Sequence, residues 1–185
     1  MLALVLAYIV DCIGLATYYK IKFWVPVIAK HPTILDTRKM IFSNPFYNQH
    51  YVLLVNMKLS SSVPRMQILD IANSEVVFRT RVMHGKNSGG QLAVHFSNLS
   101  GSNMTSLGRY VIVGQYSGKY GKAYRLAGLD ATNSNALSRS IVLHQSRYFG
   151  FGKIGRSEGC PAVSKKAMIE MTPYLKTGTL IWVYK

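Results

Sequence analysis

The residues of this 185-residue chain best suited to covalent chemistry are Cys160 and His144. Cys160 follows a glycine, precedes Pro161 and comes shortly after the turn-forming run 149–152. A glycine at this place lets the backbone bend sharply and present its N–H groups beside the sulfur. His144 closes the apolar run 141–143, which predicts a histidine at the end of a strand. Together they are the minimal set for thiol acyl transfer, although many such pairs are simply packed in a core.

In that chemistry Cys160 is the nucleophile, because a thiol attacks a carbonyl as its thiolate. His144 is the base that takes the thiol proton and the acid that protonates the leaving amine. The backbone N–H groups of Gly159 and Cys160 are candidates for an oxyanion hole. Positive potential near the thiol in sequence comes from Lys153, Arg156 and Lys165.

The sequence around the two residues contains two short motifs, His144–Tyr148 and Gly155–Val163. They resemble the signature of the L,D-transpeptidase catalytic domain family (YkuD-like), in the murein branch with Gly-Arg-Ser-x-Gly-Cys-Pro-Ala-Val. The resemblance covers roughly residues 50–185. Further motifs that match the family are Val82–Gly89, Phe96–Asn98, Ser106–Tyr110, Gly118–Gly121, Arg125–Leu129 and Gly178–Ile181.

The resemblance implies that Cys160 attacks a carbonyl of a peptidoglycan stem peptide, at its third residue, and releases D-alanine. An amine of a neighbouring stem then resolves the thioester into a 3–3 cross-link, or water resolves it in an L,D-carboxypeptidase. The resemblance also implies acylation of Cys160 by carbapenems, no cofactor, and a place in the bacterial cell envelope with a role in cell-wall synthesis and cell shape.

The family's motif is matched residue by residue at Arg156, Ser157 and Gly159. His84 belongs to a His-Gly motif of the same resemblance, so we expect it either in the substrate cleft or as a hydrogen-bonded turn residue. Two other arginines, Arg125 and Arg139, are candidates for binding a substrate carboxylate, or else solvated surface residues.

Three residues depart from the family's usual pattern: Gln145, Glu158 and Ala162 stand where glycine or serine, histidine and asparagine are common. A carboxylate at position 158 raises the pKa of the thiol if it points inward, and matters little if it faces solvent. This supports a rival hypothesis, a basic module that binds the cell wall without catalysis and keeps an idle cysteine.

The formal net charge of +15, from 22 Lys and Arg against 7 Asp and Glu, predicts an anionic partner such as a wall polymer or acidic lipid. The aromatic residues lie at strand-like positions rather than in a basic stacking motif, so nucleic acid is not the predicted partner. Two cysteines, Cys12 and Cys160, do not form a disulfide framework, and the five scattered histidines lack zinc spacing, so no metal is predicted.

We divide the chain into an apolar segment 1–19, a linker or irregular extension 20–50 and a catalytic domain 51–185. The first segment contains Asp11, is preceded by no lysine or arginine, and is followed by Lys20 and Lys22. An export signal or membrane anchor of unresolved orientation, and a buried or interfacial helix, remain open alternatives.

Short β-prone runs punctuated by glycine, serine and asparagine predict a mainly β fold, an antiparallel sandwich or barrel with one or two short helices. Ser164 is a good N-cap for a helix over 165–175, which Pro173 is expected to end early. The predicted strands are 51–56, 66–70, 75–82, 110–113, 123–126, 140–143 and 179–184.

Overall fold

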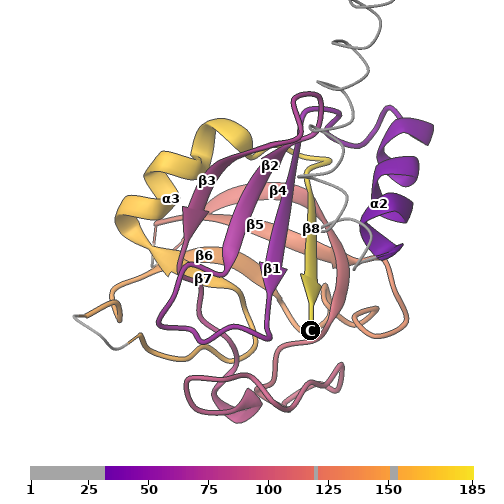
Figure 1. Cartoon of the computed structure of the whole chain (residues 1–185). Helices are drawn as coiled ribbons and strands as arrows, with labels where there is room; N and C mark the ends of the chain where they lie inside the picture. Colours follow the sequence, from indigo (N-terminus) through magenta and orange to yellow (C-terminus); the bar gives the residue numbers. More distant parts are fainter. Residues whose placement is uncertain (1–31, 119–120, 151–153) are drawn as a thin grey trace, which may run out of the picture. The chain divides into compact units, whose positions relative to one another are not determined.

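The computed structural model describes residues 32–118, 121–150 and 154–185 (Figure 1). The chain divides into two compact units, 1–43 and 44–185, and the strands that the structure describes all belong to the second. In the first unit the described element is helix α2 (Pro32–Ser43), and proline is well suited to a first helical turn. Predictions about 1–19, about Cys12 and about Lys153 lie outside the described residues. In the part described, no helix combines the length and the apolar character needed to cross a membrane.

The second unit is built on one eight-stranded sheet with the order β3-β2-β1-β8-β4-β5-β6-β7. Neighbouring strands are antiparallel except β1 with β8 and β6 with β7, which are parallel. The strands are β1 (Tyr51–Asn56), β2 (Met66–Asp70), β3 (Glu75–Thr80), β4 (Gly108–Gly118), β5 (Gly121–Gly128), β6 (Val142–Ser146), β7 (Ala162–Ser164) and β8 (Leu180–Tyr184).

The sheet folds over on itself into two layers, with β1, β2, β3 and β8 across β5, β6 and β7 (Figure 1). The long strand β4 pairs with β8 at its beginning and with β5 along its length. Its register with β5 shifts between Ile112 and Gly114, and such a bulge bends a strand and increases its twist. Side chains of both layers fill one hydrophobic core, so the predicted mainly β sandwich or barrel is confirmed.

Burial differs between the central strand β1 and the edge strand β3. The four central residues of β1 are buried on both faces, as its continuous apolar sequence predicts. The edge strand β3 has no buried residue and alternates exposed with half-buried positions. Predicted strands 51–56 and 66–70 have the observed bounds, whereas β4 and β5 extend beyond the predicted 110–113 and 123–126.

The strand that carries His144 differs from the prediction, because β6 begins at Val142 and ends at Ser146. His144 is therefore in the middle of the strand and not at its end. The strand begins late because Ser140 has a φ of 55°, so the chain is still turning at this residue. The parallel partner β7 then pairs with residues 144–146 and extends the strand beyond the apolar run.

Helix α3 (Lys165–Met171) begins where the sequence predicts, because the Ser164 hydroxyl accepts a hydrogen bond from the Ala167 N–H at 3.1 Å. The α-helical part ends before Pro173, which lies in a 3-10 turn over residues 172–174. The helix packs against β6 and β7 and buries Ala167, Met168 and Met171. It thereby supports β6, which carries His144, and β7, which follows Cys160 in the chain.

Candidate active site

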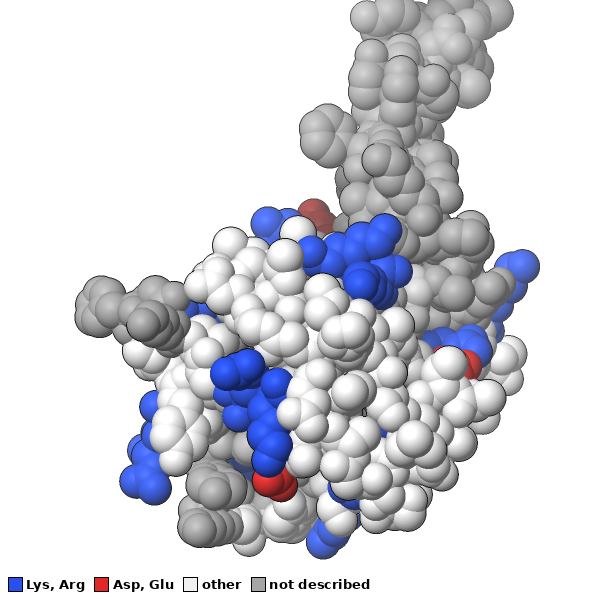
Figure 2. Space-filling view, turned by 90° about the horizontal axis from the view of Figure 1, so that it is seen from below, with Lys and Arg blue, Asp and Glu red and all other residues white. Residues whose placement is uncertain are grey.

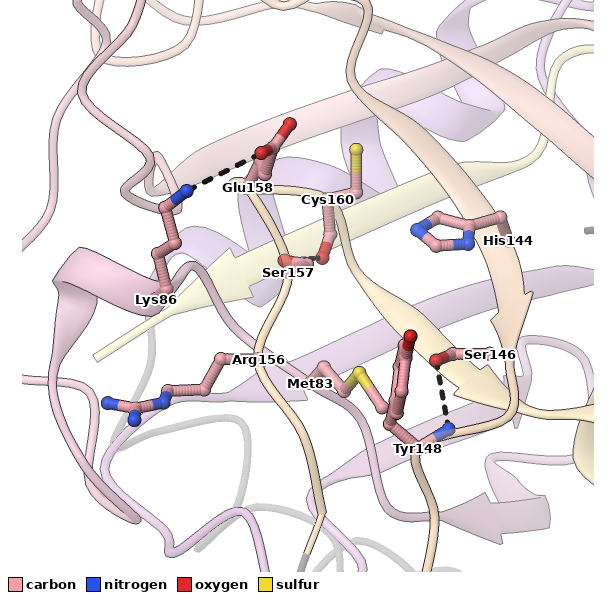
Figure 3. Close-up of a pocket in the computed structure, with 9 residues that line it drawn as sticks. All are labelled: Met83, Lys86, His144, Ser146, Tyr148, Arg156, Ser157, Glu158 and Cys160. Atoms are coloured by element: carbon pink, nitrogen blue, oxygen red, sulfur yellow. Dashed lines mark hydrogen bonds and ion pairs between the residues drawn. The ribbon is translucent and has the colours of Figure 1, made fainter.

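Cys160 and His144 line the same open pocket, of about 350 Å³ (Figure 3). In Figure 3 the imidazole lies on one side of Cys160, together with Met83, Ser146 and Tyr148. The charged side chains lie on the other side. The full lining is Met83, Lys86, His144, Ser146, Tyr148, Arg156, Ser157, Glu158 and Cys160.

The pairing of β6 with β7 brings the two residues together. His144 stands opposite Ala162 in this parallel ladder, and its N–H donates to the Pro161 carbonyl at 3.3 Å. Cys160 precedes Pro161, so the ladder places the thiol-bearing residue beside the histidine strand. The sequence motifs around His144 and Cys160 are thus neighbours in space because of one strand pair.

The imidazole of His144 has a defined tautomer. Its Nδ1 lies 2.8 Å from the carbonyl oxygen of Gln145, which can only accept, so Nδ1 carries a proton and donates it. The neutral ring then has its lone pair on Nε2. Gln145 supports the histidine through its backbone oxygen, so the departure from the family's glycine or serine leaves this bond available.

The Cys160 thiol is half-buried and is held in its protonated form. Its Sγ donates to the Ser140 carbonyl at a donor–acceptor distance of 3.8 Å. Burial raises the pKa of the thiol, and the Glu158 carboxylate raises it further. The Val142 N–H and the Arg139 guanidinium act in the opposite direction without reversing the shift. Thiolate formation therefore requires a base.

The turn before Cys160 is closed by the Ser157 hydroxyl. Ser157 Oγ donates to the Cys160 carbonyl at 2.6 Å and accepts from the Gly159 N–H at 3.1 Å. Of the two backbone donors predicted for an oxyanion hole, the Gly159 N–H is thus engaged inside the turn. Ser157 is a component of the turn that shapes the backbone on which Cys160 stands.

Glycine is required at position 159 by both conformation and space. Gly159 has a φ of 124°, which favours glycine, and is buried. A Cβ at this position would lie 2.8 Å from the Met104 carbonyl oxygen and 3.1 Å from Nη2 of Arg139. The turn and the arginine behind it therefore fit only around a residue without a side chain.

Arg139 lies behind the nucleophile turn, in contacts that the sequence did not reveal. Its guanidinium donates to the Met104 carbonyl at 2.6 Å and to the Ser97 carbonyl at 2.9 Å, and its charge lowers the pKa of the Cys160 thiol. The sequence suggests Arg139 as a ligand for a substrate carboxylate, but in the structure these donors point at backbone oxygens of the protein. Its acceptors lie far away in sequence, so no local pattern signals these contacts.

Glu158 faces solvent, with its side chain 79% exposed, at the mouth of the pocket. Its Oε1 lies 3.4 Å from Nζ of Lys86, whose side chain is 49% exposed, and an ion pair this exposed is weak. Glu158 therefore faces solvent, as in the second of the two alternatives, but its charge still raises the pKa of the thiol. Arg156 lines the pocket as well and donates to the Gly89 carbonyl at 3.0 Å.

His84 does not line the pocket. Its side chain is fully buried, with Nδ1 2.7 Å from Nη2 of Arg65 and Nε2 3.4 Å from the Gly89 carbonyl. Of the two alternatives for His84, the structure agrees with a buried, hydrogen-bonded residue and not with one that lines the cleft. Burial, and next the Arg65 charge, lower its pKa, so the ring is neutral at pH 7.

Four lining residues, Met83, Lys86, Ser146 and Tyr148, have side chains that the sequence analysis did not assign. Each lies within a motif that matches the family, and this match is the signal in the sequence that could have found it.

No group of three or more His, Cys, Asp or Glu side chains able to hold a metal ion occurs among the residues described. Lys and Arg form separate groups over the face in Figure 2, with few acidic side chains among them.

Comparison with known proteins agrees with the sequence motifs. A family model described as the L,D-transpeptidase catalytic domain matches residues 33–184. The matched range begins within the stretch 20–50 that we separated from the catalytic domain, at the start of α2. No curated protein matches the chain.

Solved structures similar to this chain include an L,D-transpeptidase from Mycobacterium smegmatis, with 11% identity, TM-score 0.49, and coverage of 74% of this chain and 59% of that one. Another is the Bdellovibrio bacteriovorus protein Bd1075, with 17% identity, TM-score 0.49, and coverage of 76% and 49%. A third is LdtMt1 in complex with imipenem, with 12% identity, TM-score 0.47, and coverage of 73% and 59%.

The chain thus spans about half to three fifths of the length of these proteins. The sequence match, which extends over most of the chain and includes both His144 and Cys160, carries the assignment. This chain belongs to the L,D-transpeptidase catalytic domain family.

Proposed function

We propose that this protein is a cysteine acyltransferase that acts on peptidoglycan stem peptides. The observation that carries the proposal is the common pocket of Cys160 and His144, joined by the register of β6 with β7. The hydrogen bond from His144 Nδ1 to the Gln145 carbonyl supports it, because it leaves the lone pair on Nε2. These are the nucleophile and base that thiol acyl transfer needs.

In the first half of the reaction, His144 Nε2 takes the thiol proton after Cys160 Sγ turns from the Ser140 carbonyl towards the imidazole. The thiolate adds to the carbonyl of the third stem residue, and the Cys160 N–H stabilises the oxyanion. The C–N bond to D-alanine then breaks, and the imidazolium of His144 protonates the departing amine. A thioester on Cys160 remains.

In the second half, the amine of a neighbouring stem adds to the thioester and gives its proton to His144. The C–S bond breaks, Cys160 regains its proton, and a 3–3 cross-link is the product. With water in place of the amine, the same steps release a shortened stem, and the protein is an L,D-carboxypeptidase. The reaction takes place in the cell envelope, where the basic surface is suited to anionic wall polymers.

A second candidate, a wall-binding module without catalysis, is favoured by one observation. The thiol donates to Ser140, and burial together with Glu158 raises its pKa, so the resting cysteine is not activated. A thiol of this kind attacks a carbonyl only when a base acts on it. The two candidates therefore differ in whether His144 performs this step.

The test is incubation of the protein with a disaccharide-tetrapeptide substrate, followed by mass spectrometry of the products. Acyl transfer gives a 3–3 cross-linked dimer and free D-alanine, and hydrolysis gives the tripeptide and D-alanine. Cys160→Ala is expected to abolish both products while retaining the fold. An unchanged substrate with the folded wild-type protein contradicts the proposal and favours the wall-binding module.

A further inference from the structure

Arg65 and His84 form a buried pair behind the nucleophile turn. Arg65, in the loop between β1 and β2, is 1% exposed, and His84 is 0% exposed. Nη2 of Arg65 lies 2.7 Å from Nδ1 of His84. Arginine has donors only, so Nδ1 accepts and the ring proton is on Nε2, which donates to the Gly89 carbonyl at 3.4 Å. This hydrogen bonding fixes His84 as one neutral tautomer.

The pair is unusual because the buried guanidinium has a neutral partner. Its remaining donors go to carbonyls: Nε and Nη2 to Val82 at 3.1 and 2.8 Å, and Nη1 to Leu59 at 3.1 Å. Across the described ranges of the chain, no ion pair involves Arg65. Burial lowers its pKa to about 10. A buried cation without a carboxylate is costly, which indicates that the pair does more than fill space.

The backbone of His84 holds the turn directly. The His84 carbonyl accepts from the Ser157 N–H at 2.9 Å, and the Lys86 N–H donates to the Ser157 carbonyl at 2.7 Å. Both backbone groups of Ser157 are thereby fixed to the segment that carries His84. The Ser157 hydroxyl in turn binds the Cys160 carbonyl and the Gly159 N–H. A continuous chain of contacts therefore joins the His84 ring to the nucleophile.

A second contact connects the same ring with the residue before Ser157. The Gly89 carbonyl accepts from His84 Nε2 and also from Nη1 of Arg156 at 3.0 Å. The position of His84 thus affects the turn through its own backbone and through the shared acceptor Gly89.

We propose that Arg65 and His84 are positioning residues that hold the turn of Ser157 and Cys160 in place as long as His84 is uncharged, and that protonation of His84 loosens this turn. The catalytic half of the proposal rests on the acyl transfer proposed above. The structural half, a turn coupled to the charge of His84, does not.

The electrostatic reason is the pair geometry. A proton on Nδ1 would replace the acceptor of Arg65 by a second donor and place two positive charges at a nitrogen–nitrogen distance of 2.7 Å. The charged groups that act on the ring are Arg65 and Arg156, and both are cations. Burial is the largest cause that lowers the pKa of His84, followed by the charge of Arg65, so both the site and its neighbour favour the neutral ring.

The first experiment measures amide hydrogen-exchange protection of Ser157 and Gly159 by NMR, as a function of pH, on the whole chain without substrate. In the wild type, protection is expected to fall as the pH is lowered and His84 becomes protonated. The fall is up to about tenfold for each pH unit, because one proton is linked to opening of the turn. In His84→Asn, Oδ1 can still accept from Arg65 but cannot titrate, so this pH dependence is expected to vanish. The matched control is His95→Asn, an exposed histidine in the same stretch of chain.

A second variant keeps the test decisive if His84→Asn does not fold. Arg156 is exposed, and Arg156→Gln removes one of the two cations that act on His84. The midpoint of the loss of protection is then expected to move to higher pH. An unchanged midpoint, or the same pH dependence in His84→Asn as in the wild type, would overturn the proposal.

The catalytic half is read from acylation by imipenem over the same pH range. His84→Leu removes the acceptor of Arg65, and a misplaced nucleophile is expected to acylate about 100-fold more slowly. His84→Asn is expected to recover most of that rate and to lose the acid limb that follows His84. An inert wild type with intact pH-dependent protection would refute acyl transfer alone. Normal acylation in His84→Leu would refute the positioning role alone.

Discussion

His144 and His84 show how two environments give the same side chain two different patterns of hydrogen bonding. His144 is half-buried at the pocket, with Nδ1 bonded to a carbonyl and its lone pair on Nε2. His84 is fully buried, and its Nδ1 lone pair is occupied by a guanidinium. The first histidine has the hydrogen bonding that the proposed proton transfers need, whereas the second is held neutral by its neighbours.

The same difference separates the pocket from the region behind the nucleophile turn. On the pocket side, Lys86 and Glu158 are exposed and weakly paired. Behind the turn, Arg65 and Thr105 are buried and bonded to several backbone groups. Changes on the pocket side are therefore expected to alter chemistry without altering stability, and changes behind the turn to alter both.

The largest effect is expected from His144→Ala. Loss of the base should slow acylation of Cys160 roughly 10²–10⁴-fold, with little change in the melting temperature. Stopped-flow or intact-mass kinetics with a carbapenem measures the rate, and His95→Ala is the control. A rate within about threefold of wild type would mean that His144 supplies less than general-base catalysis ordinarily does.

Next in size is Gly159→Ala, which changes the region behind the turn. A non-glycine residue at a φ of 124° costs about 1–3 kcal/mol, and the new Cβ also collides with the Met104 carbonyl oxygen. Denaturant unfolding should show this loss together with slower acylation. Gly101→Ala is the matched control, because its φ of 72° is also positive but a Cβ there meets nothing within 4 Å.

If Gly101→Ala is destabilised as much as Gly159→Ala, the contacts with Met104 and Arg139 do not matter. The requirement for glycine would then be one of backbone conformation only.

Arg139→Gln, also behind the turn, should have a smaller effect on the thiol, together with a loss of stability because the Met104 and Ser97 carbonyls lose their donor. The arginine lowers the pKa of Cys160, so its removal raises that pKa further and leaves less thiolate at neutral pH. Alkylation by iodoacetamide is expected to slow by up to about tenfold. Arg125→Gln is the control, since Arg125 is exposed and stacks on Tyr116 at 4.5 Å. Unchanged alkylation would remove Arg139 from the electrostatic account of the thiol.

The smallest effect, with the opposite sign, is expected from Glu158→Gln. The carboxylate raises the pKa of Cys160, so its removal lowers that pKa and speeds alkylation, by less than about fivefold because the side chain is exposed. Added salt should reduce the difference from wild type. Lys86→Met is expected to act in reverse, since it leaves the carboxylate without its cation. Slower alkylation in Glu158→Gln would contradict the assigned sign.

Much of the architecture follows from local sequence patterns. The apolar run 51–56 and the Ser164 cap predict β1 and the start of α3, because burial and capping act over a few residues. The bounds of β6 do not follow, because the pairing with β7 that extends it depends on residues 162–164. The sequence motifs likewise single out Cys160 and His144 as candidates, because their residue types and spacing are local features, and the structure has both in one pocket.

Local sequence patterns do not predict the contacts of the residues behind the turn. Arg65 and Arg139 read as ordinary surface cations, and only the fold shows that their donors are bound to distant carbonyls. The engagement of the Gly159 N–H by Ser157 depends on the closed shape of the turn, which the motif alone does not specify. Long-range burial decides these functions, and a single sequence contains little information about it.

The measurement that tests the central claim most directly is intact-mass spectrometry of the protein after incubation with imipenem, beside Cys160→Ala and His144→Ala. A live acyl-enzyme site gives a stoichiometric adduct in the wild type, none in Cys160→Ala and slow formation in His144→Ala. A folded wild-type protein that forms no adduct, or an adduct that persists in Cys160→Ala, would contradict the account.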